Sequence, residues 1–142
     1  VAGSIEGLPD SYNYSEVYNL TLSFEGGPSQ PGNVNQGGFH LWASEGELSI
    51  LDATTQLYNA NEVGHTEAGN DQTSWEVIWT APATDRNVEF VLHVNSVNGN
   101  ADGAGGGAVG GGTGGAVCGA KFSPTEKAAG GVGVIVAACK AR

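Results

Sequence analysis

The chain of 142 residues contains no methionine, only three histidines, two cysteines and five basic residues. It has no run of about 18 apolar residues, so neither a transmembrane helix nor membrane insertion is expected. The segment that starts at Val1 also lacks the charged start and the apolar core of a secretory signal. The absence of methionine and of a signal is what we expect of a processed or excised chain.

Basic residues are scarce and unevenly placed. Residues 1–102 hold 14 of the 15 acidic residues and a single base, Arg86, whereas residues 103–142 hold one acid and four bases. An acidic body of this kind repels nucleic acid and anionic membrane surfaces, so neither is an expected partner. The charge is compatible with a salty or extracellular setting, where screening relieves self-repulsion, and also with an ordinary acidic surface.

Two segments, residues 73–82 and 88–97, alternate apolar and polar side chains with period two. The apolar positions that share a face are Trp75, Val77 and Trp79 in the first segment, and Val88, Phe90, Leu92 and Val94 in the second. This pattern predicts half-buried antiparallel strands, each with one side on a core and the other near water.

Further strands are predicted on both sides of a loop at residues 26–32. They cover residues 1–8, 16–24, 38–44 and 47–51, with one short strand near Leu57 in the less regular segment 56–69. Turns are predicted at residues 9–11 and 70–72, and residues 84–87 read as a hairpin-like connection between the two alternating segments. Short strands with turn signals every 8–12 residues or so favour an all-β antiparallel sandwich over a parallel sheet.

The composition changes at about residue 103, which divides the chain into a predicted sandwich domain, residues 1–102, and a Gly-rich C-terminal tail, residues 103–142. The tail holds 13 of the 24 glycines and both cysteines. Residues 103–115 are predicted to be a flexible linker, because so glycine-rich a run cannot pack a core. Residues 132–136 are expected either to form a closing strand or to belong to a tail foreign to the fold, such as a frame-shifted reading of the gene.

The two cysteines, Cys118 and Cys139, lie in this tail. In an exported chain such a pair favours one disulfide, which would stabilise the fold by about 3 kcal/mol in the chain-entropy model. Two unpaired thiols are the alternative.

Several motifs resemble, in their order, those of reelin-like (Reeler) domains, and more closely their prokaryotic relatives, the "choice-of-anchor V" surface domains. They are Gly37-Gly-Phe-His-Leu41, Gly64-His-Thr66, Ser74-Trp-Glu-Val-Ile-Trp-Thr-Ala-Pro82 and Asn95-Ser-Val-Asn-Gly99, preceded by Ile5-Glu-Gly-Leu-Pro9 and Tyr18-Asn-Leu-Thr-Leu22. The resemblance covers about residues 3–102. It implies a secreted or cell-surface, immunoglobulin-like β-sandwich without catalytic activity and without an established ligand or cofactor.

The candidate binding residues lie on the predicted strands. His40 and His93 alternate with apolar neighbours, so they are expected to face outward, either as plain surface residues or as part of a ligand site. Trp42 shares the phase of His40, and an exposed tryptophan is a candidate contact for a sugar or a protein partner, although packing at an edge is its plainer role.

His65 stands in a predicted loop. The simpler interpretation is that His65 fixes the loop by hydrogen bonding. The more specific one is that it is a ligand to a metal or to a haem carried by an upstream segment. Many prokaryotic relatives carry a Cys-x-x-Cys-His haem-attachment motif before the domain, and this chain contains none. Oxygen ligands for calcium are close together at Glu67, Asn70 and Asp71, but they lack the EF-hand order, so an acidic turn is the preferred interpretation.

No catalytic set is recognisable, since Gly-x-Ser-x-Gly is missing and carboxylate pairs arise by chance on an acidic surface. We therefore expect a non-catalytic, extracellular or cell-surface accessory module for adhesion or ligand binding, with a cell-surface protein or glycan as partner. The alternative is a redox accessory domain in which His65 covers or ligates a haem or metal. The sequence does not indicate an oligomeric state.

Overall fold

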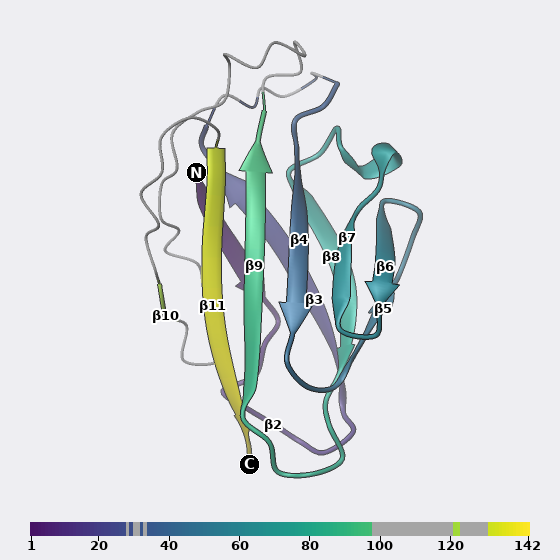
Figure 1. Cartoon of the computed structure of the whole chain (residues 1–142), viewed down its shortest axis with the longest axis vertical. Coiled ribbons are helices and arrows are strands. Elements are labelled where there is room, and N and C mark those ends of the chain that lie inside the picture. The colour runs from purple at the N-terminus through teal and green to yellow at the C-terminus, as the bar shows by residue number, and fades with distance from the viewer. Residues whose placement is uncertain (28, 30–31, 33, 98–120, 123–130) are drawn as a thin grey trace.

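The computed structural model describes residues 1–27, 29, 32, 34–97, 121–122 and 131–142, with the backbone alone for 121–122 and 131–138. Two β-sheets are packed face to face (Figure 1), and the described residues contain no α-helix, only the short 3₁₀ helix η1, Glu67–Gly69. This architecture confirms the predicted all-β sandwich. The predicted linker at residues 103–115 and Cys118 lie outside the described residues.

The first sheet has four strands, in the spatial order β1-β3-β8-β5. Their bounds are Ala2–Glu6 for β1, Val17–Glu25 for β3, Ser74–Thr80 for β8 and Glu47–Ile50 for β5. Each neighbouring pair is antiparallel. The predicted strands at residues 1–8, 16–24 and 47–51 therefore form, with ends shifted by a few residues, and they share one sheet with the Trp75 strand.

The second sheet has the order β10-β11-β9-β4-β7-β6, and β2 lies parallel to β11 beyond this path. Their bounds are Lys121–Phe122 for β10, Gly131–Ala141 for β11, Val88–Ser96 for β9, Gly37–Ala43 for β4, Glu62–His65 for β7, Thr55–Asn59 for β6 and Ser11–Tyr12 for β2. Strand β11 runs antiparallel along the whole of β9, from Gly131 opposite Ser96 to Cys139 opposite Val88.

The core lies between the sheets and is built by the alternating positions that the sequence predicts. Its largest fully buried side chains include Trp75, Trp79 and Phe90, and the Trp79 and Phe90 rings meet edge-on with centroids 4.9 Å apart. Both buried indoles have a hydrogen-bond acceptor: Trp75 Nε1 donates to the Gly69 carbonyl at 2.7 Å, and Trp79 Nε1 donates to the Glu45 carbonyl at 3.0 Å. Burial therefore leaves neither indole N–H unsatisfied.

The connection between β8 and β9 differs from the prediction. Residues 84–87 do not close a hairpin, because β8 belongs to the first sheet and β9 to the second. Both strands turn their apolar faces to the core, β8 from the first sheet and β9 from the second, because the chain crosses between the sheets here. The buried Tyr12 hydroxyl lies at this crossing, where it accepts from the Arg86 N–H at 2.7 Å and lies 3.0 Å from the Thr84 carbonyl.

Two local predictions are also corrected. The single strand expected near Leu57 is one arm of a hairpin, β6 and β7, whose strands pair from Thr55 opposite His65 to Asn59 opposite Glu62. The turn predicted at residues 9–11 ends one residue early, because Ser11 already belongs to β2 and pairs with Lys140. Strand β2 forms through a pairing partner that is distant in the sequence, which local alternation does not report.

The C-terminal strand includes the predicted segment 132–136 within its longer span. Cys139 near its end is buried, with 1% of its surface exposed, and belongs to the core. The disulfide between Cys118 and Cys139 stays a prediction, since Cys118 lies outside the described residues.

Candidate ligand-binding site

His40, Trp42 and His93 all lie on the outer face of the second sheet, away from the core. His40 on β4 is directly opposite His93 on β9, and Trp42 is opposite Val91. His93 is exposed, whereas His40 and Trp42 are partly buried. The structure thus brings the three residues singled out from the sequence onto one face and spares all three from the core.

The two imidazole rings stack across the strands. Their centroids are 6.1 Å apart with an interplanar angle of 21°. His40 Nε2 lies 3.2 Å from the Glu62 carboxylate on β7, and the Tyr58 ring of β6 is 5.9 Å from the His40 ring on the other side. Burial lowers the pKa of His93, and the neighbouring His40 lowers it further, because both effects disfavour a second positive charge at this position.

His65 reaches the same region from the end of β7. Its Nδ1 lies 3.2 Å from both the amide nitrogen and the carbonyl oxygen of Phe39, so the ring is bound to the backbone in either tautomer. The ring occupies the space of an absent side chain at Gly38, where a Cβ would meet His65 Cε1 at 2.2 Å. The Gly37-Gly38 pair therefore lets the imidazole close in on the start of β4.

A pocket of about 620 Å³ opens between these residues at the end of the sheet where β4 starts and β9 ends. We call it the histidine pocket. Its lining residues are Asn35, Gly37, Gly38, Phe39, His40, His65, Asn70, His93, Val94, Asn95 and Val97. All three histidines of the chain line this one space, although His65 follows His40 by 25 residues and His93 follows His65 by 28.

The lining combines apolar residues with unpaired amides. Within the part of the chain that the structure describes, the side chains of Asn35, Asn70 and Asn95 have no hydrogen-bond partner. None of the described lining residues is an aspartate, glutamate, lysine or arginine. An apolar cleft with a few polar groups free to bond is the usual form of a small-molecule site.

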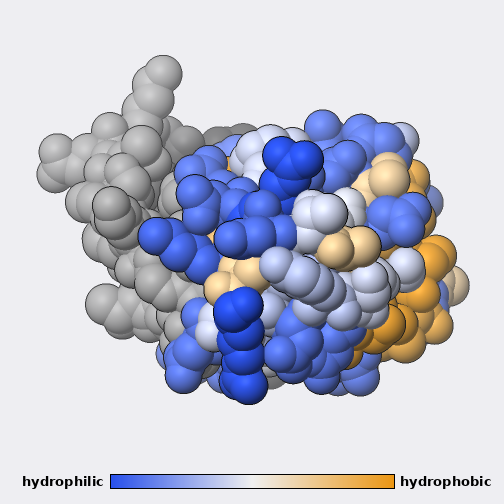
Figure 2. Space-filling view, turned by 90° about the horizontal axis from the view of Figure 1, so that it is seen from below, coloured by the Kyte–Doolittle hydropathy of each residue, from blue (hydrophilic) through white to orange (hydrophobic). Residues whose placement is uncertain are grey.

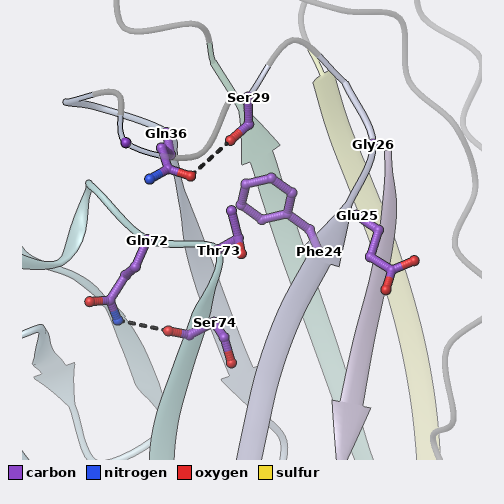
Figure 3. A pocket seen from close by; sticks show the side chains of 9 residues that line it. Phe24, Glu25, Gly26, Ser29, Gln36, Gln72, Thr73 and Ser74 are labelled. Atoms are coloured by element: carbon purple, nitrogen blue, oxygen red, sulfur yellow. Dashed lines mark hydrogen bonds between the residues drawn. The ribbon is translucent and has the colours of Figure 1, made fainter.

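A second pocket, of about 660 Å³, is lined by residues from the ends of β3 and β8 and from the loop after β3. Figure 3 shows that some of its polar side chains are bonded to their surroundings: Ser29 Oγ donates to Gln36 Oε1 at 3.3 Å, and Gln72 Nε2 donates to the Ser74 carbonyl at 2.7 Å. Gln36 Nε2 also donates to the Asp71 carbonyl at 2.7 Å. The amides of Gln36 and Gln72 are thus bonded within the protein. Because it gathers all three histidines of the chain, the histidine pocket is the better candidate for a ligand.

No metal centre is found among the described residues, where no group of three or more His, Cys, Asp and Glu side chains could hold an ion. The three histidine rings surround a space and do not converge on one point. The oxygen cluster at Glu67, Asn70 and Asp71 is a turn that includes η1, and the Asn70 carbonyl accepts from the Gln36 and Gly37 amides at 2.6 and 3.1 Å.

The face that Figure 2 shows from below is mostly hydrophilic, with an apolar area on the side of β5 and β6. The large apolar side chains exposed there are Ile50, Leu51, Leu57 and Tyr58, between 42% and 56% exposed. Over the described residues, no helix is long and apolar enough to cross a membrane.

Comparison with known proteins points to one fold. No family model matches the chain, and no curated protein matches it either. Among solved structures, the human F-spondin reeler domain (fragment 1) is 18% identical, covers 99% of this chain and 88% of its own, and superposes with a TM-score of 0.53. Fragment 2 of the same human domain gives 25% identity over 68% of this chain and 74% of its own, with a TM-score of 0.48. The Reelin-N domain of F-spondin gives 26% identity over 68% and 70%, with a TM-score of 0.46.

The alignment with fragment 1 includes nearly the whole chain, and at 18% identity it concerns the fold alone. The chain is a Reeler-like domain in its fold, as its ordered motifs predict. Its assignment to the prokaryotic "choice-of-anchor V" type stays a prediction.

Proposed function

We propose that the chain is a non-catalytic accessory module that acts outside the cell or at its surface and binds its ligand in the histidine pocket. The observation behind this proposal is that His40, His65 and His93, from three different strands, line one cleft together with three asparagines. Sandwich domains commonly place binding residues at one end of the sheets, on a scaffold that the core keeps rigid.

Adhesion would use the same face for a larger partner. Trp42 lies on this face, two residues after His40 on β4, but does not line the pocket. It would therefore extend the contact surface toward the middle of the sheet. A cell-surface protein or glycan that seats one group in the pocket would then cover Trp42 as well.

The redox alternative has less support. His65 Nδ1 is within hydrogen-bond distance of the Phe39 backbone, and its ring is fixed above Gly38. A role for His65 in holding the start of β4 needs no metal, so the ring is better explained as one wall of the pocket.

A ligand screen tests the proposed binding function. We would titrate isotope-labelled protein with a fragment library of sugars, carboxylates, amines and aromatic compounds, and map the amide and imidazole shifts by NMR. We expect at least one class to shift His93 and Asn95, and the same compounds to lose binding in His93→Ala. If no class shifts these residues, or if all hits map to the other sheet, the proposal is wrong.

The location can be tested separately with the full precursor. After cell fractionation, we expect the protein in the surface or secreted fraction, where an added protease reaches it in intact cells. A precursor found only in the cytosol would contradict the extracellular part of the proposal.

A further inference from the structure

We propose that the histidine pocket takes an uncharged saccharide unit. This inference rests on the proposed function, because it presupposes that the pocket is the ligand site. It adds the chemical class of the ligand, which neither the fold nor the ordered motifs supply.

The charge of the site favours an uncharged ligand. The chain carries 15 acidic and 5 basic residues, yet the described lining of the pocket has no side chain with a fixed charge. A negatively charged ligand would approach an acidic body without a lysine or arginine to pair with, and a cation would find no carboxylate in the lining. The Glu62 carboxylate, which does not line the pocket, is 3.2 Å from His40 Nε2. An uncharged ligand avoids both costs.

The lining of the pocket offers both hydrogen-bond donors and acceptors. Each asparagine amide offers a carbonyl acceptor and two N–H donors, and each neutral imidazole offers one donor and one acceptor. Asn35, Asn70 and Asn95 have no partner for these groups among the described residues. A sugar hydroxyl is both donor and acceptor, so a set of hydroxyl groups matches this mixture without leaving a polar group unpaired.

The size and shape of the pocket also suit a saccharide unit. Its volume of about 620 Å³ lies within the range of ordinary small-ligand sites, about 300–1,000 Å³. The stacked rings of His40 and His93 lie on one side, and the ring of His65 lies above Gly38 on another. Flat rings beside asparagine amides suit a sugar ring, which has apolar C–H faces and a polar rim.

Two other ligands fit less well. A metal ion needs its ligands to converge, and no described group of three His, Cys, Asp or Glu side chains does so. An anion would be bound best by charged imidazoles, whereas burial and the neighbouring His40 lower the pKa of His93 and so disfavour its charged form.

The test is a binding array of uncharged oligosaccharides, including chitotriose, mannotriose, maltotriose and lactose, printed beside sulfated and uronic-acid glycans. The wild-type chain is compared with Asn95→Ala and with Asn19→Ala as the matched control. Both asparagines are exposed strand residues, Asn95 on β9 beside the pocket and Asn19 on β3 in the other sheet. We expect at least one uncharged glycan to bind, tenfold or more weakly in Asn95→Ala and without change in Asn19→Ala.

Three outcomes would overturn the inference. They are an array with no uncharged ligand, binding confined to sulfated or uronic-acid glycans, and equal losses in the two asparagine variants. The fragment screen separates these outcomes from a failure of the proposed function. If acidic or aromatic fragments shift His93 while no sugar does, the pocket is a ligand site and only the ligand class is wrong.

Discussion

His93 stands directly opposite His40 across strands β9 and β4, and the two imidazole rings stack with their centroids 6.1 Å apart. The pair is the centre of the outer face that carries the candidate site. Since the rings are so close, the charge of one affects the protonation of the other.

We expect the pKa of His93 to lie below 6.5, the ordinary value for histidine, in the folded protein. An NMR titration of the imidazole signals measures it. His40→Gln removes the neighbouring charge and is expected to raise the pKa of His93 part of the way back, because the effect of burial remains. A pKa of His93 at or above the ordinary value, or one that His40→Gln leaves unchanged, would contradict this account.

The same shift sets the pH dependence of stability. Because the folded state holds the His93 proton less tightly than the unfolded state, the unfolded state takes up a proton first as the pH falls. The contribution of His93 to stability is therefore complete above the ordinary pKa and decreases as the pH falls through about 6.5 toward the folded-state value. Urea unfolding of wild type and His93→Gln between pH 7.5 and pH 5 should show a smaller pH dependence in the variant.

The two classes of tryptophan should differ in their contribution to stability. Trp79 is fully buried and its indole N–H is hydrogen-bonded, so Trp79→Ala should cost about 3–5 kcal/mol of unfolding free energy. Trp42 is only partly buried on the outer face, and Trp42→Ala should cost less than about 2 kcal/mol. Denaturant unfolding measures both. Equal losses would mean that the burial of the two rings does not differ in solution.

The ring of His65 and the missing side chain of Gly38 should be energetically coupled. Gly38→Ala places a Cβ within the imidazole, so the ring must move, and we expect a loss of about 1–3 kcal/mol. In the His65→Ala background the same substitution meets no ring and should cost less. The double-mutant cycle measures the coupling energy. Additive effects would show that the ring does not occupy this space.

Tyr12 should stabilise the crossing between the two sheets. Its hydroxyl is the acceptor for the Arg86 N–H and lies 2.8 Å from the Arg86 carbonyl. Tyr12→Phe keeps the buried ring and removes these bonds, with an expected cost of about 1–3 kcal/mol. Hydrogen exchange of the Arg86 amide should become faster in this variant, while amides in the middle of β9 change only as far as global stability does. An unchanged Arg86 amide would contradict the proposed role of the hydroxyl.

The sequence predicts the sandwich because the period-two pattern is strong in the strands that cover the core. The faces of Trp75 to Trp79 and of Val88 to Val94 are buried as predicted, since one side of each strand must cover the core. The same pattern does not say to which sheet a strand belongs. For that reason the connection at residues 84–87 was predicted as a hairpin, although the chain crosses between sheets there.

The candidate site was predictable only in part. Alternation placed His40, Trp42 and His93 on an outer face, but nothing in the sequence shows that His65 joins the other two histidines, because that depends on the β6–β7 hairpin and its pairing with β4. Asn35, Asn70 and Asn95 come from two loops and a strand, and only folding brings them together. The Gly37-Gly38 pair was the available signal, since two glycines at the start of a strand indicate close approach of another group.

The central claim is that the histidine pocket binds an uncharged saccharide. The most direct measurement is an NMR titration of isotope-labelled protein with the uncharged oligosaccharide that binds best, recorded at pH 7 and followed at the side chains of His93, His65 and Asn95. The account predicts saturable shifts of these three signals, with the signal of Asn19 on the other sheet unchanged. Saturable shifts on the first sheet alone, or no shift at any pocket side chain, would contradict it.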